Sequence, residues 1–112
     1  MKETTEADFL DFTEACQVWI NKLHLNDWDC KFAVRDKEGA DAWCNISHGT
    51  RKVLLCIVPQ REGLSSIEEL AKHECLEILL ADLAGTLSVY RSEGFVEDEV
   101  HKVINRLMKV LQ

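Results

Sequence analysis

Basic residues are scarce in this sequence. The 112 residues include 13 Lys and Arg against 20 Asp and Glu, which gives a formal net charge of −7. Proteins that bind nucleic acid through a basic surface need clustered Lys and Arg, because these side chains displace counterions from the phosphates. We therefore expect no nucleic-acid partner, and the acidic surface indicates mainly solubility.

Long apolar runs are missing as well. A membrane-spanning helix needs roughly 18 consecutive apolar residues, and no segment approaches that length. Residues 1–8 hold a single Lys with no apolar run behind it, so a secretory signal is not expected. These features predict a cytoplasmic protein without a membrane partner.

The cysteines lack the spacing of a cysteine-based metal site. Their number is odd, they are widely separated, and no two of them form a CxxC pair. This pattern argues against a zinc site made of cysteines and is typical of reduced thiols that pack as small apolar residues in the cytoplasm. The five are Cys16, Cys30, Cys44, Cys56 and Cys75.

Size and hydrophobic patterning predict one compact α+β domain over residues 1–112. The chain is 46% hydrophobic, contains one proline, and shows no internal repeat or domain linker. The expected order of elements places the helices against a small, mostly antiparallel three-stranded sheet. From the periodicity of apolar residues we expect a helix over 5–24, strands over 28–36, 40–48 and 51–58, a helix from Ser65 or Ser66 to about 85, and a last helix over about 96–111.

The most informative segment is 73–77, with the sequence HECLE, inside the second predicted helix. At about 100° per residue, His73 and Glu77 project about 40° apart on a face that also carries Leu70. Burial of a carboxylate beside an imidazole costs several kcal/mol unless a counter-charge compensates, and a divalent cation does so effectively. The segment therefore predicts a metal site.

The spacing resembles the HExxH helix of zinc peptidases, with Glu77 in place of the second His. Zinc needs a third protein ligand, and the best candidate is His101, at the rim of the apolar stripe of the last helix. Glu97 and Glu99 are the alternatives. These ligands would leave one position for water, and Glu74, the general base, would take a proton during attack on a peptide carbonyl.

Simpler interpretations compete at each of these positions. His73 and Glu77 could pair with each other or with an Arg, and so form only a polar patch at a helix edge. His24 and His48 stand at the ends of predicted elements and are expected to be exposed or capping residues. Cys75 lies about 200° from His73 around the helix and is expected to pack in the core.

Over residues from about 15 to 112 the chain resembles the small single-domain zincin-like metallopeptidases of bacteriophage and prophage genomes. The resemblance rests on the strand over 51–58, on the segment HECLEILL at 73–80, and on the segment EVHKVINRL at 99–107. It implies a minimal zincin-like core, a bound Zn²⁺, and hydrolysis of a peptide bond. It also implies a cytoplasmic location, in the host cell if the protein is phage-encoded.

The same resemblance implies that a strand near the metal helix presents its edge to an extended peptide, at 42–46 or at 53–58. Zinc peptidases usually have His at the position of Glu77. A carboxylate ligand donates more charge to the ion and makes it a poorer Lewis acid, so this difference affects activity more than metal binding. The alternative function is a non-catalytic metal-binding or inhibitory protein with the same fold, which a fourth protein ligand would favour.

Overall fold

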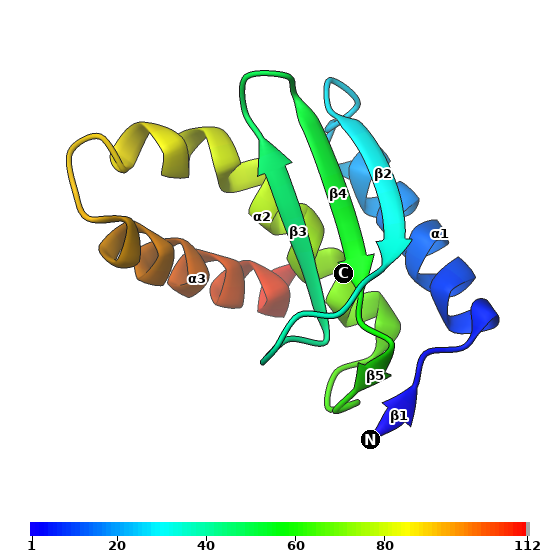
Figure 1. Ribbon diagram of the computed structural model, residues 1–112. Coiled ribbons are helices and arrows are strands. Elements are labelled where there is room, and N and C mark those ends of the chain that lie inside the picture. Colours follow the sequence, from blue (N-terminus) through cyan, green and yellow to red (C-terminus); the bar gives the residue numbers. More distant parts are fainter. Residues whose placement is uncertain (112) are drawn as a thin grey trace.

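The computed structural model describes residues 1–111 and has the predicted α+β architecture (Figure 1). Each predicted helix and strand is present, although its ends differ by a few residues from the expected ones. The elements are β1 (Lys2–Glu3), α1 (Glu6–Lys22), β2 (Asp29–Val34), β3 (Ala42–Ser47), β4 (Lys52–Ile57), β5 (Gln60–Arg61), α2 (Ile67–Leu87) and α3 (Glu93–Val110).

The main sheet is mixed, which corrects the expectation of a mostly antiparallel one. Its strand order is β2-β4-β3, with β4 parallel to β2 and antiparallel to β3. β4, which has a nearly continuous apolar sequence, takes the central place and is the most thoroughly buried of the three. Residues 35–41 therefore carry the chain past β4, so that β2 and β3 do not form a hairpin. β1 and β5 form a separate antiparallel pair.

This strand order decides which edge could receive a peptide. β4 is paired on both sides, so the alternative at 53–58 is wrong. In the described part of the chain, β3 pairs only with β4, and its other side keeps the unpaired backbone groups of an edge strand.

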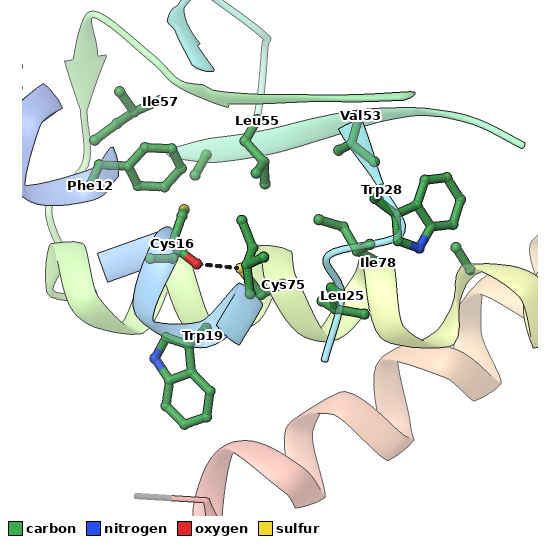
Figure 2. Packing of buried hydrophobic residues seen from close by; sticks show 14 residues of the cluster. Phe12, Cys16, Trp19, Leu25, Trp28, Val53, Leu55, Ile57, Cys75 and Ile78 are labelled. Carbon is green, nitrogen blue, oxygen red and sulfur yellow. Dashed lines mark hydrogen bonds between the residues drawn. The ribbon is translucent and has the colours of Figure 1, made fainter. Parts of the chain in front are cut away.

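The core lies between one face of the sheet and the helices α1 and α2 (Figure 2). Leu55 on β4, Phe12 on α1 and Cys75 on α2 are fully buried. The thiol of Cys75 donates a hydrogen bond to the carbonyl of Cys16, with 3.7 Å between sulfur and oxygen. The prediction that Cys75 packs in the core is therefore confirmed.

Side-chain caps fix where α2 and α3 begin. Ser66, not Ser65, is the N-cap of α2; its hydroxyl accepts from the backbone N–H of Glu69, whose carboxylate accepts in return from Ser66 N–H. α3 is capped by Ser92 and starts at Glu93, one turn earlier than expected. The apolar stripe begins only at Val96, so hydrophobic periodicity missed this exposed first turn.

Lys72 on α2 is hydrogen-bonded to the C-terminal end of α3. Its ammonium group donates hydrogen bonds to the carbonyls of Met108, at 2.9 Å, and of Leu111, and it lies 5.4 Å from the ring centre of Trp19. α2 and α3 thus run side by side after the connection between them (Figure 1). No helix in residues 1–111 is long and apolar enough to cross a membrane.

Candidate metal centre

The HECLE segment lies where α2 passes between β3 and α3 (Figure 1). Cys75 and Ile78 point from α2 into the core beneath the sheet. His73 and Glu77 lie on another side of the helix and remain partly accessible, with 31% and 26% of their side-chain surface exposed. Helical geometry therefore separates the residues that build the core from those that could hold an ion.

The structure brings the three predicted ligands together. Glu77 Oε1 lies 3.0 Å from His101 Nε2 and 3.6 Å from His73 Nε2. The two imidazole rings are stacked, with 5.9 Å between their centres. One ligand atom from each residue falls within 4.8 Å of the other two, a group we call the imidazole group.

The alternatives to His101 do not share this position. Glu97 and Glu99 are exposed on α3, and neither belongs to a group of converging ligand atoms among the described residues. The carboxylate of Glu99 instead accepts a hydrogen bond of 2.9 Å from Lys102. Of the three, His101 alone is partly buried and lies against Glu77 on α2.

Glu77 is the anionic member of the imidazole group. Burial works against its ionisation, but the interactions with His73 and His101, together with those of Glu74 and Cys44, outweigh burial and lower its pKa. Two imidazole nitrogens and a carboxylate oxygen are donors that zinc accepts. The residues present therefore fit a zinc ion, since their donor atoms converge and carry one negative charge toward it.

Glu74 occupies a more enclosed place beside Glu77. The residue is only 4% exposed, and its Oε1 atom has no hydrogen-bond partner among the described residues. Burial, together with the neighbouring Glu77 carboxylate, raises the pKa of Glu74. A buried polar atom without a partner costs about 1–3 kcal/mol, so its presence calls for a functional explanation.

Cys44 is the residue of this region that sequence reasoning missed. Its thiol donates a hydrogen bond to Glu77 Oε2 at 3.3 Å, and Cys44, Glu74 and Glu77 form a second set of converging ligand atoms, which we call the thiol group. Burial and the carboxylates of Glu74 and Glu77 raise the pKa of the Cys44 thiol. The only signal in the sequence was the apolar alternation of Ala42, Cys44 and Ile46, which places the thiol on one face of the strand. The pairing of Cys44 with the core residue Leu55 then turns that face toward α2.

A pocket of about 620 Å³ opens next to the site. His73 and Glu74 form part of its wall, and Ala42, Leu70 and Met108 supply apolar surface. Its lining also carries a set of acidic residues from the loops and the start of α2, namely Asp36, Glu38, Asp41, Glu62 and Glu69. The pocket gives a molecule in solution access to His73 and Glu74, whereas Glu77, His101 and Cys44 do not line it.

The remaining histidines lie outside both groups. His24 and His48 are exposed, which confirms that prediction. His48 meets the ring of Trp28 edge-on and lies 3.7 Å from Asp82. Asp82 is mainly engaged by Arg51, at 2.7 Å, so this second cluster of charges is a surface ion-pair network.

Comparison with known proteins identifies no relative. No family model, curated protein or solved structure matches the chain. Function therefore has to be argued from the residues of the site.

Proposed function

We propose that this protein is a zinc-dependent, metallopeptidase-like protein in which His73, Glu77 and His101 hold Zn²⁺ and Glu74 acts as general base. The observation that carries the proposal is the convergence of three donor atoms within 4.8 Å of one another, beside a buried carboxylate with an unpartnered oxygen. A zincin-like relationship, a peptide or protein as substrate and a cytoplasmic location belong to the same proposal.

The roles follow from where each side chain lies. Zinc would supply a Lewis acid that makes water more acidic and polarises a carbonyl group. Glu74 lines the pocket from a buried position. Burial and Glu77 raise its pKa in the metal-free protein, and the positive charge of a bound zinc ion would favour the ionised carboxylate, which can take up a proton and release it to the leaving amine. The free side of β3 could hold an extended peptide by backbone hydrogen bonds.

A second candidate function is supported by Cys44. A non-catalytic metal-binding or inhibitory protein closes its metal site with protein ligands, and Cys44 places a sulfur 3.3 Å from Glu77 Oε2. Under this alternative the protein binds zinc and a protein partner but hydrolyses nothing.

The test is zinc analysis of the purified protein together with two ligand variants. We expect about one zinc per chain in the wild type under metal-limited conditions, and loss of that zinc in Glu77→Ala and His101→Ala. Glu99→Ala is the matched control, because Glu99 lies on α3 near His101 but bonds to Lys102; it should keep the metal. Wild-type protein that neither retains nor rebinds zinc would overturn the proposal.

A further inference from the structure

Glu77 presents its two oxygens to two different sets of donors. Oε1 faces the imidazoles of His73 and His101, whereas Oε2 accepts the hydrogen bond from Cys44. A carboxylate in this position can bridge two cations, one on each oxygen. The imidazole group and the thiol group share Glu77 and differ in every other member.

The thiol group has a feature that its internal contacts do not explain. Glu74 is 4% exposed, yet its Oε1 has no hydrogen-bond partner in the described chain. A proton on this carboxyl would remove its charge but would still leave Oε1 without a partner. A cation bound by the group would place a positive charge beside the buried Glu74 carboxylate and would offset the repulsion between the two carboxylates.

We propose that Cys44, Glu74 and Glu77 form a second zinc site, in which Glu77 bridges two ions and occupancy inhibits the protein by engaging Glu74. The bridging and the inhibition rest on the proposed function. The donor set selects the ion, since a thiolate with two carboxylates suits zinc, whereas magnesium and calcium prefer oxygen ligands throughout.

Binding at this site exchanges one bond for another without any redox step. The S–H bond of Cys44 breaks, a zinc–sulfur bond forms, and the proton leaves to solvent. Two cations bridged by one carboxylate repel each other, so we expect the second ion to bind more weakly than the first. Inhibition should therefore develop only when zinc exceeds one equivalent.

The experiment is a titration of the metal-free protein with Co²⁺, which reports a bound thiolate by a charge-transfer band in the near ultraviolet. The band should be absent while the first equivalent of Co²⁺ binds and should appear as the second equivalent binds. Cys44→Ser should bind one equivalent and show no band. Cys30→Ser is the matched control, because Cys30 is a half-buried cysteine on β2 outside both groups; it should behave as wild type. Equilibrium dialysis against zinc should give the same stoichiometries.

The outcomes separate this inference from the proposed function. His101→Ala should lose the first equivalent and keep one that shows the thiolate band. If wild type binds a single ion with the band and His101→Ala leaves it unchanged, the proposed function fails while the Cys44 site stands. A single ion whose band disappears in His101→Ala means one mixed site and overturns the inference. Absence of a thiolate band at every equivalent overturns it as well.

Discussion

At the scale of single residues, Glu77 connects the two halves of the site. Its oxygens contact imidazoles from both α2 and α3 and a thiol from β3. A carboxylate at this position therefore offers more than a second imidazole would. A neutral imidazole offers one nitrogen lone pair to a metal, because its other nitrogen carries a proton. A carboxylate offers a second oxygen, which Cys44 contacts here.

The role of Glu74 can be tested by an isosteric change. Glu74→Gln should bind the first equivalent of zinc as wild type does, because Glu74 lies outside the imidazole group, but it should lower any peptide hydrolysis by at least about 100-fold, the usual contribution of a general base. Zinc content and cleavage of a mixed peptide library are the measurements. Glu97→Gln, an exposed carboxylate on α3, is the control, and equal turnover by Glu74→Gln would remove Glu74 from its role.

Glu74 also predicts a pH dependence of stability in the metal-free protein. Burial and Glu77 raise its pKa from an ordinary 4.5 to about 9. The folded chain then keeps a proton that the unfolded chain has released, so the free energy of unfolding should fall as pH rises from about 5 to about 9. Glu74→Gln cannot titrate and should flatten this slope.

Urea unfolding in the presence of a chelator, repeated across that pH interval, measures the slope for Glu74→Gln and wild type. Glu97→Gln should unfold with the wild-type pH dependence, because Glu97 is exposed. Identical slopes in wild type and Glu74→Gln would show that Glu74 does not hold the extra proton.

At the scale of elements, the placement of His101 depends on how α3 is attached. α3 buries only Val96 and Ile104 fully, so apolar packing alone fixes it weakly. The hydrogen bonds from Lys72 to the carbonyls at the end of α3 add an attachment one residue before His73. One turn of α2 thus carries the candidate ligand His73 and also Lys72, which attaches α3. The other histidine ligand, His101, lies on α3.

Removal of the Lys72 ammonium group should loosen this attachment. We expect Lys72→Met to lower the free energy of unfolding by about 1–2 kcal/mol, because charged hydrogen bonds to helix-end carbonyls are lost, and to weaken zinc binding without abolishing it. Urea unfolding and competition with a chromophoric chelator measure the two effects. Lys109→Met, at an exposed position in the last turn of α3, should change neither, and wild-type zinc affinity in Lys72→Met would contradict the anchoring role.

At the scale of the whole molecule, local signals predicted the elements and distant contacts decided their arrangement. Apolar patterns located the three helices and the three strands of the main sheet, and the pair Ser65 and Ser66 marked the start of α2. The two-residue strands β1 and β5 were not predicted. The parallel pairing of β2 with β4 was not predictable, because it depends on where residues 35–41 carry the chain. Cys44 was missed for the same reason: it reaches Glu77 only once β3 lies against α2.

A substitution in the core tests whether the sheet and the helices unfold as one cooperative unit. Leu55 is fully buried on the central strand, and Leu55→Ala should cost about 2–5 kcal/mol of unfolding free energy through lost apolar contact and a cavity. The matched control is Leu64→Ala, because Leu64 is 92% exposed and should change stability by less than about 0.5 kcal/mol. If the two variants unfolded at similar urea concentrations, Leu55 would not belong to the core that stabilises the fold.

The site takes its donors from β3, α2 and α3, which are far apart in the sequence. An unfolded chain does not hold these groups together, so an ion that binds there binds the folded state alone. At a free zinc concentration 100 times the dissociation constant, such binding adds about 2.7 kcal/mol to the free energy of unfolding. The zinc supply of the surroundings would then set how firmly the sparsely buried helix α3 stays docked.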